Sequence, residues 1–490
     1  MSVSSGSTLN ELLGELKLLL RPRLRENQEA YSLYNRIRDI IMNTLSIDYE
    51  YMVELEGSLA KDTNIGGETD LDIFILVKKD DITNSWIKTN IIRPLRNALT
   101  MKGFNAKLRY SSHPYINVSW RIYSADIVPA YWATNINDIK TAVDRTPFHT
   151  KYVVSRLKDE QKDEVRLLKK FLKGVGVYGA EIKTSGFSGY LCELLIIKYG
   201  TFINSIKSMA SWKPPQLVII EDTNGTEIDN KLHGVTPLVV PDPVDLRRNA
   251  AAAVSLKSFE TAVLAAKLFL THPSRDYFFP RREAFSSDEL SNAVKKSGRC
   301  PVIAVYRVAH GVAPDVLWGE LRRVGRKCVN VLKESDFKVI DVRAWSNEGP
   351  IAMIFLDVLN CNTSVSRIHI GPYPHMGPNS LAFIYKYVDS PTSIGPWVGD
   401  DGRLYVVKPV RYTSPTDALL SNRSRVEGKH VKLVFVARSI DELVKKVIPL
   451  GVSKGEVLYG RPKQSCPTFL KTYIMPLHDL HLNITGTGSP

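Results

Sequence analysis

The chain contains 490 residues, of which 44% are hydrophobic and 24% are charged, an ordinary composition for a water-soluble protein. One hydrophobic core cannot support a chain of this length, so we expect roughly three or four domains. The 65 Lys and Arg residues outnumber the 51 Asp and Glu residues and give a net charge of +14, which favours a polyanionic partner such as nucleic acid.

The apolar pattern and the cysteines exclude several classes of protein. No window reaches the ~18 uninterrupted apolar residues of a membrane span, and the Ser-rich start lacks the features of a signal peptide. We therefore expect a cytoplasmic protein without a membrane partner. The cysteines are scattered and lack metal-ligand spacing, so we interpret all five as reduced thiols and not as a zinc site: Cys192, Cys300, Cys328, Cys361 and Cys466.

The first 150 residues are predicted to form a sheet with helices on it. Apolar residues follow helical spacing from Glu26 to Leu45 and, despite Pro94, from Trp86 to Leu99. Alternating apolar residues predict five strands, at 51–55, at the stretch carrying Asp70 and Asp72, and at about 106–110, 115–122 and 125–128. This compact domain is expected to close near residue 145.

Residues 151–272 are predicted to form a helical domain. Its expected elements are a helix at 161–172 stopped by Gly174 and Gly176, a helix at 189–199 capped by Ser188, a breaker-rich loop at 214–243, and an Ala-rich helix at 245–270.

The third domain is predicted to begin after a boundary at 273–280. Its order of strand (302–308), helix (315–332), strand (338–345) and strand (351–359) fits a ferredoxin-like α/β arrangement. A late strand at 432–437 and a helix at 440–447 are expected to complete it. The intervening stretch from 370 to 415 is dense in Gly and Pro and gives few helix signals.

The pair Asp70 and Asp72 is the first candidate for a functional site. Side chains alternate along a strand, so both carboxylates face one side while Leu71 and Ile73 face the core. Two adjacent carboxylates repel each other unless a cation lies between them, and their oxygen atoms suit Mg²⁺. The alternative is a solvated acidic face of an edge strand.

A Gly-Ser turn precedes this pair and adds a second feature. Backbone N–H groups after Gly57 and Ser58, where a strand turns into a short helix, can bind phosphate, and Lys61 can add a positive charge. A simple N-cap role for Ser58 is the alternative.

A lone Asp between apolar strand residues, Asp126 in YSADIVPAYW, supplies a third carboxylate. A buried, unpaired Asp is costly, so a metal role is the cheaper explanation. Two bound ions with a third carboxylate near the attacking hydroxyl suit nucleotidyl transfer. The combination of Gly-Ser, Asp-x-Asp and a later strand Asp resembles the nucleotidyltransferase superfamily that includes DNA polymerase β.

Three later segments narrow this resemblance. They are DRTPFHTKYV (144–153), LLKKFLKGVGVYGAEIKTSGFSGYLCELLI (167–196) and DPVDLRRNAAAAVS (242–255). With GSLAKDT and DLDIF they resemble, in order over the first ~260 residues, the archaeal class I CCA-adding enzymes. The C-terminal half is similar in length and layout but offers no comparably specific motif.

The resemblance implies an enzyme that adds C, C and A to the 3′ end of tRNA from CTP and ATP, with Mg²⁺ and without a nucleic-acid template. It implies that Asp70, Asp72 and Asp126 bind metal and catalyse. The residues implied to contact the nucleotide are Gly57, Ser58, Lys61, Thr146, His149, Lys169, Tyr178 and Arg248, the last with Arg247 as a neighbouring register. Lys61 stands where the family commonly has Arg, so charge is kept but bidentate geometry is lost.

Read without the family, these residues carry weaker signals. His149 could be a loop histidine with a structural bond, Lys169 a solvated lysine, and Tyr178 a core residue. Arg247 and Arg248 at an expected helix start lie at the unfavourable end of the dipole, which mildly favours a ligand role.

The implied fold is α+β and multidomain, in four parts. These are a polymerase-β-like catalytic head (1–150), a helical nucleotide-binding neck (151–272), a ferredoxin-like body (273–365 plus about 430–490) and an α/β tail (366–429) that contacts the tRNA elbow.

For tRNA binding the sequence offers two groups of residues. One is a basic cluster that is equally well explained as a solvated helix face, Arg322, Arg323, Arg326 and Lys327. The other group lies in the Gly/Pro-rich region and could stack on the tRNA; its members are His369, Tyr373, His375, Arg403 and Tyr405.

The sequence leaves open whether the chain forms a homodimer. The alternatives are a poly(A) polymerase or related terminal nucleotidyltransferase, and an inactive RNA-binding scaffold, which the presence of all three carboxylates disfavours.

Overall fold

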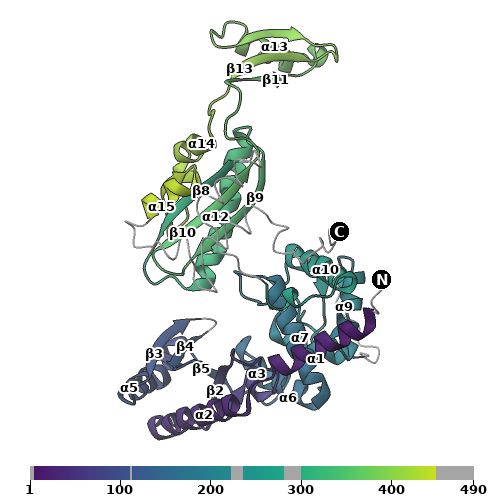
Figure 1. Cartoon of the computed structure of the whole chain (residues 1–490). Coiled ribbons are helices and arrows are strands. Elements are labelled where there is room, and N and C mark those ends of the chain that lie inside the picture. Colours follow the sequence, from purple (N-terminus) through teal and green to yellow (C-terminus); the bar gives the residue numbers. More distant parts are fainter. Residues whose placement is uncertain (1–4, 111–112, 222–235, 281–299, 448–490) are drawn as a thin grey trace. The chain divides into compact units, whose positions relative to one another are not determined.

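The computed structural model describes residues 5–110, 113–221, 236–280 and 300–447 (Figure 1). It forms two compact units that divide between residues 281 and 282. None of the described helices is both long and apolar enough to cross a membrane.

Within residues 1–150, the range called the head below, the chain forms a five-stranded mixed sheet. The strand order is β1 (Tyr51–Glu56), β2 (Asp70–Val77), β5 (Tyr123–Tyr131), β4 (Pro114–Trp120) and β3 (Asn105–Tyr110). β2 and β5 run parallel, and the other neighbours are antiparallel. All five predicted strands are confirmed, and β5 runs three residues past its expected end.

Helices cover one face of this sheet. α2 (Leu24–Thr44) packs its buried side chains on alternate residues of β2, such as Leu71 and Ile73. The helix predicted around Pro94 is a continuous helical run of α4 (Asn84–Ile87), a wider π-turn η1 (Lys88–Ile92) and α5 (Arg93–Met101). Pro94 lies in the first turn of α5, where its missing N–H costs least. The opposite face carries the carboxylates at one end of β2 and β5, and further along the same strands a smaller buried apolar cluster that includes Phe74, Leu76 and Ala130.

Another part of the first unit is a helical bundle around one large apolar core, which is called the neck below; it includes α1 (Ser5–Leu20), from the range 1–150 that was predicted for the head. Its long helices are α1 (Ser5–Leu20), α6 (Thr146–Arg156), α7 (Asp159–Val175), α8 (Gly189–Tyr199), α9 (Phe202–Ser211) and α10 (Leu256–Thr271). Short elements complete the unit: α3 (Gly57–Ala60), η2 (Ile136–Asp138), η3 (Val143–Arg145), η5 (Arg275–Tyr277), and the paired β6 (Gln216–Leu217) and β7 (Leu238–Val239).

Individual residues explain where two of the neck helices begin and end. The Ser188 hydroxyl accepts the N–H of Leu191, so α8 begins where predicted. α7 does not stop at Gly174, which instead packs against the backbone of Tyr277; Gly176, with φ +85°, ends the helix.

The structure contains helices in this unit that were not predicted from the sequence, and it shortens one helix that was predicted. The Ser-rich start is helical from Ser5, because α1 buries Leu16 and Leu20 in the neck core. α9 was not expected from the sequence. Residues 245–255 are not helical: the side chain of Asn249 accepts the N–H groups of Val240 and Ala251 and replaces helical hydrogen bonds. Arg247 and Arg248 therefore precede α10 and do not start it.

The second unit contains an antiparallel sheet of order β14-β8-β10-β9, which is the strand order of a ferredoxin-like β-α-β-β-α-β arrangement. Its elements are β8 (Cys300–Val308), α12 (Pro314–Glu334), β9 (Val339–Ser346), β10 (Ile351–Val358), α14 (Pro415–Ser421), η7 (Arg423–Arg425), β14 (Val431–Ala437) and α15 (Ile440–Val447).

A smaller sheet of order β11-β13-β12 is inserted between β10 and α14. It consists of β11 (Ser366–Ile370), η6 (Pro374–Met376), α13 (Pro378–Tyr387), β12 (Ile394–Val398) and β13 (Leu404–Pro409). The sequence did not indicate α13, because Gly and Pro dominate its surroundings. The four-part division into head, neck, body and tail stays a prediction.

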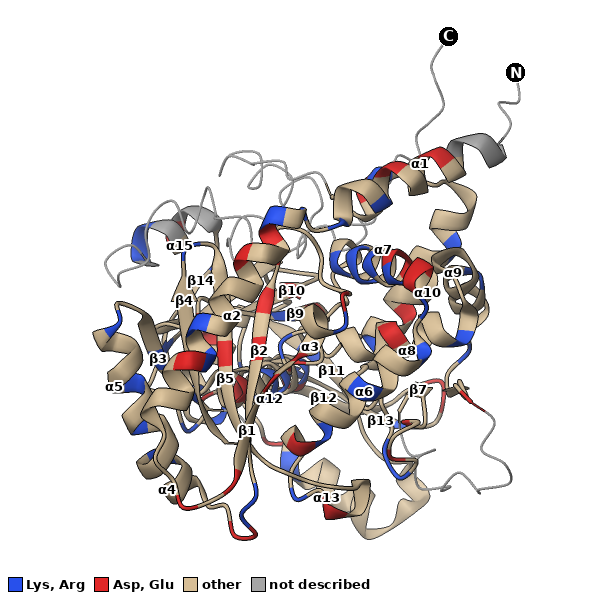
Figure 2. Cartoon of the chain, turned by 90° about the horizontal axis from the view of Figure 1, so that it is seen from below, with Lys and Arg blue, Asp and Glu red and all other residues tan. Residues whose placement is uncertain are grey.

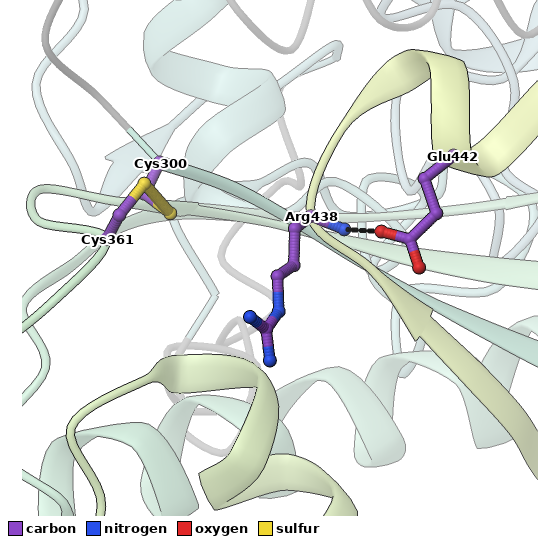
Figure 3. The surroundings of a disulfide bond; sticks show 4 residues. All are labelled: Cys300, Cys361, Arg438 and Glu442. Carbon is purple, nitrogen blue, oxygen red and sulfur yellow. Dashed lines mark hydrogen bonds between the residues drawn. A yellow bond between two sulfur atoms is a disulfide. The ribbon is translucent and has the colours of Figure 1, made fainter.

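Cys300 and Cys361 form a disulfide (Figure 3). The prediction that all cysteines are reduced thiols is therefore wrong for this pair. Cys300 begins β8 and lies opposite Val358 of β10, so the chain brings Cys361 beside it just after β10 ends. Cys192 and Cys328 are free and buried, and Cys466 lies outside the described residues.

Candidate active site

The three predicted catalytic carboxylates lie on the two parallel strands of the head sheet, on the face opposite α2 and α5. Asp72 pairs with Asp126 across the strands, and Asp70 pairs with Ser124 one step earlier. The acidic segments of β2 and β5 are red in Figure 2. Asp70 and Asp72 thus share a face, while Leu71 and Ile73 are buried on the other, as alternation predicts.

The row that contains Asp72 and Asp126 crosses the whole sheet. Glu56 pairs with Asp72, Asn117 with Asp126, and Lys107 with Asn117. Asn117 donates a hydrogen bond of 2.6 Å to Oδ1 of Asp126 and another to the Ser124 hydroxyl. The amide therefore fixes the orientation of Asp126, a role the sequence did not indicate.

Burial and mutual repulsion act on these carboxyl groups. Burial, and then the charges of Asp126 and Asp70, raise the pKa of Asp72 to about 7, against the opposing effect of Lys61 and Lys169. The pKa of Asp126 is also raised, by burial first, although the Asn117 hydrogen bond opposes this. A nearby cation would offset both effects.

The donor set fits Mg²⁺. In the described part of the chain, no three carboxylate, imidazole or thiolate side chains are already gathered tightly enough to form a metal site. Asp70, Asp72 and Asp126 nevertheless offer oxygen atoms only, and Mg²⁺ typically takes one or two protein carboxylates and completes its shell with water and substrate phosphates.

The Gly-Ser turn touches the carboxylates directly. Gly57 has φ +72°, and a Cβ there would overlap Oδ2 of Asp72, so both the backbone and the space require glycine. Ser58 lies inside α3, whose N-cap is Glu56, so the N-cap alternative for Ser58 is wrong. The N–H of Thr63 donates to the carbonyl of Ser58 and closes the turn.

Lys61 and Lys169 are buried and share one partner. Their side chains donate to Glu193 of α8, at 2.6 Å from Lys61 to Oε2 and 2.9 Å from Lys169 to Oε1. Lys169 is only 3% exposed, so the solvated-lysine alternative is wrong. The lone Glu in the apolar run LCELLI was the only sequence signal for this contact.

A buried arginine ties the same turn to the neck. Arg166 of α7 donates to the carbonyls of Asp62 (2.6 Å) and Asn64 (2.8 Å). It also pairs with Asp163 at 2.9 Å. The turn after α3 is thereby held against α7 in a fixed geometry.

A second cluster gathers around the buried Asp242. His149 of α6 contacts Oδ2 at 2.9 Å, Arg248 donates to Oδ2 at 2.6 Å, and Tyr190 donates to Oδ1 at 2.8 Å. The rings of His149 and Tyr190 stack with centroids 4.0 Å apart. Arg247 instead forms an ion pair with Asp245, so of the two arginines only Arg248 contacts Asp242 together with His149.

Thr146 and Tyr178 lie at the edges of these groups. Thr146 begins α6, one turn before His149. Tyr178 is half-buried, with the Lys173 ammonium 4.9 Å from its ring centroid. The sequence predicted neither Asp242 nor Tyr190 as a site residue: the contact between them spans 52 residues, and that between Asp242 and His149 spans 93.

Comparisons with known proteins cover most of the chain. The family model "tRNA nucleotidyltransferase, second domain" matches residues 163–279, and "CCA-adding enzyme, C-terminal domain" matches residues 297–440. A CCA-adding enzyme of Saccharolobus solfataricus is 38% identical over 79% of this chain and 86% of its own length. One of Pyrobaculum islandicum is 37% identical over 84% of this chain and 93% of its own length.

Another CCA-adding enzyme, of Sulfurisphaera tokodaii, is 35% identical over 80% of this chain and 87% of its own length. Among solved structures, a cytoplasmic RNA terminal U-transferase is similar with a TM-score of 0.44 and 16% identity, covering 56% of this chain and 99% of that one.

Proposed function

The chain belongs to the archaeal-type CCA-adding enzymes, a family of tRNA nucleotidyltransferases, and on this premise we propose that Asp70, Asp72 and Asp126 form its active site. The reaction adds C, C and A to the 3′ end of tRNA from CTP and ATP. In each step the 3′-hydroxyl oxygen attacks the α-phosphorus, a phosphodiester bond forms, and pyrophosphate leaves.

Asp70, Asp72 and Asp126 would hold Mg²⁺ on the sheet face opposite α2 and α5. When bound there, Mg²⁺ would lower the pKa of the attacking hydroxyl and neutralise charge on the leaving pyrophosphate. Asp126, oriented by Asn117, helps remove the proton of the 3′-hydroxyl. The Asp72–Asp126 register across β2 and β5 is the single observation that carries this assignment.

The nucleotide is proposed to bind beside this row. Backbone N–H groups of the Gly57–Ser58 turn, with Lys61 and Lys169, are suited to the triphosphate, because they place donors and positive charge next to Asp72. Arg248 and His149, ordered by Asp242, are suited to the base and sugar, with Thr146 and Tyr178 at the margin.

The tRNA is proposed to bind mainly through the second unit. The exposed basic face of α12, which carries Arg323 and Arg326, suits the phosphates of the acceptor stem. The 366–429 insertion, proposed as the tail, would reach the elbow through aromatic and basic side chains such as Tyr373 and Arg403.

Asp126→Asn tests the proposed site. Removing this carboxylate is expected to lower the rate of C incorporation into tRNA ending at the discriminator base by about 10²–10⁴-fold, the usual contribution of a positioned proton acceptor. The matched control is Asp39→Asn, on the exposed side of α2, which should keep normal activity. The melting temperature of both variants is measured alongside.

Near-normal incorporation by a folded Asp126→Asn variant would contradict the three-carboxylate site. With the unmodified chain, labelled CTP and ATP should yield products that stop after C-C-A. A long A-tail without C incorporation would instead identify a poly(A) polymerase.

A further inference from the structure

One charged side chain lies in the middle of the neck core. Glu193 is 0% exposed and sits on α8 between Cys192 and Leu194, which are equally buried. Moving an ionised carboxylate from water into such a core is strongly unfavourable unless charged partners and hydrogen bonds compensate it. The position therefore requires a physical reason beyond packing.

Three partners supply that compensation. Lys61 donates to Oε2 at 2.6 Å, Lys169 donates to Oε1 at 2.9 Å, and the Thr63 hydroxyl donates to Oε1 at 2.7 Å. Lys169 also donates to the Thr63 hydroxyl at 2.9 Å, which closes the network. Burial raises the pKa of Glu193, but the two ammonium groups more than offset it, and the pKa falls to about 2.

The partners connect two parts of the first unit at the active site. Lys61 and Thr63 belong to the turn after α3, next to Gly57, whereas Lys169 belongs to α7 of the neck. Gly57 lies directly against the carboxylate of Asp72, and Lys61 follows it four residues later in the same turn. Burial lowers the pKa of the Lys169 ammonium, and the charge and hydrogen bond of Glu193 oppose this effect.

We propose that Glu193 is a positioning residue for the incoming nucleotide: it holds Lys61 and Lys169 as an ordered pair of cations and fixes the turn at Thr63 to the neck. This inference rests on the proposed function, because both lysines are assigned there to the triphosphate. A free Lys side chain has many rotamers, so ordering it before the nucleotide arrives removes an entropic cost of binding.

The test compares two buried carboxylates of the neck. Glu193→Gln keeps the size and loses the charge that orders both lysines. We expect the KM for CTP in tRNA extension to rise about tenfold or more, as is typical when a charged hydrogen-bond partner is lost, while the affinity for tRNA stays unchanged. Binding of CTP without tRNA, measured by calorimetry, should weaken by the same factor.

Glu164→Gln is the matched control. Glu164 of α7 is also buried, accepts the N–H of Phe202 at 2.8 Å and pairs with Lys17 at 2.5 Å, away from the carboxylate row. It should lower the melting temperature and leave the KM for CTP unchanged. A role for Glu193 in stability alone would make the two variants behave alike, with unchanged KM, and would overturn the proposal.

Glu193→Asp is the second variant, to be used if Glu193→Gln does not fold. It keeps the negative charge but shortens the side chain by one methylene group, so it should raise the KM for CTP by less than Glu193→Gln does. A KM for CTP equal to that of the unmodified chain would overturn the proposal. If the unmodified chain incorporates no C or A into tRNA, the proposed function fails. If it does incorporate them and the Glu193 variants keep a normal KM, only this inference fails.

Discussion

Asp242 illustrates how a single buried carboxylate can order a group of functional side chains. It accepts hydrogen bonds from Tyr190 and Arg248, contacts His149, and accepts the backbone N–H of Val244. Burial alone would raise its pKa, but these contacts, led by that with His149, hold the pKa at about 2. The carboxylate is therefore ionised in the folded chain across the whole physiological range.

This depressed pKa predicts a pH-dependent contribution to stability. A free Asp has a pKa near 3.9, so between about pH 4 and pH 2 the unfolded chain takes up a proton at residue 242 that the folded chain does not. The contribution is fully present above pH 4 and is lost as the pH falls to 2. By linkage it amounts to about 2–3 kcal/mol.

Asp242→Asn tests this. Relative to the unmodified chain, it should lower the free energy of unfolding at pH 7 and lose that difference progressively below pH 4, as measured by denaturant unfolding across the range. Asp39→Asn, an exposed replacement, should give no such trend. A destabilisation that is equal at pH 7 and at pH 3 would contradict the role of the Asp242 charge.

Residues that act through sheet geometry could be predicted from the sequence, whereas residues that act through distant partners could not. Alternation alone placed Asp70 and Asp72 on one face. Glu193 escaped prediction because its partner Lys61 lies 132 residues away, and no local pattern joins them. The fold brings such pairs together, so their chemistry becomes visible only in three dimensions.

At the scale of elements, long periodic segments behaved as their spacing predicts. α2, α8 and the strands of both large sheets begin and end near the expected residues, because amphipathic periodicity and caps are local properties. α1 and α13 were missed, since Ser, Gly and Pro mask their helical signal while tertiary packing of residues such as Leu16 and Tyr387 stabilises them.

The disulfide joins two elements that the sequence could not pair. Cys300 and Cys361 are 61 residues apart, and the β8–β10 pairing brings them together. Figure 3 also shows Arg438, whose backbone N–H donates to Glu442 at the start of α15. A cross-link over a loop of this length restricts the unfolded chain and typically adds about 2–4 kcal/mol.

Reduction of this bond is therefore expected to lower the unfolding temperature of the second unit by several degrees, as measured by calorimetry with and without a reductant. A Cys300→Ser/Cys361→Ser variant should unfold at the lower temperature in both conditions, and addition of C from CTP should persist at moderate temperature. Identical transitions of the unmodified chain with and without reductant would show that the bond does not stabilise this unit.

At the scale of the whole molecule, charged residues have a different role in each of the two units. The first unit holds the carboxylate row, which needs compensating cations such as Lys61 and Lys169 close by. The second unit exposes basic residues on the side of α12 opposite its buried stripe, so their charges crowd one another. Burial, and then the neighbouring Arg326, lower the pKa of Arg322. Such crowding is relieved by a polyanion, which agrees with the net charge of +14.

The basic face of α12 predicts a specific salt dependence. If Arg323 and Arg326 each neutralise one tRNA phosphate, binding releases counterions, and the logarithm of the tRNA affinity should fall linearly with the logarithm of salt concentration. Replacing both by Gln should reduce the size of that slope by about 2 and weaken binding, while the KM for CTP stays unchanged. The control is Arg93→Gln/Arg96→Gln on α5, which removes the same charge from the helices that cover the sheet face opposite the carboxylates. The slopes of tRNA affinity against salt concentration are measured by filter binding from low to moderate salt. Equal slopes for the α12 and α5 double variants would show that the basic face of α12 is only solvated and does not bind tRNA.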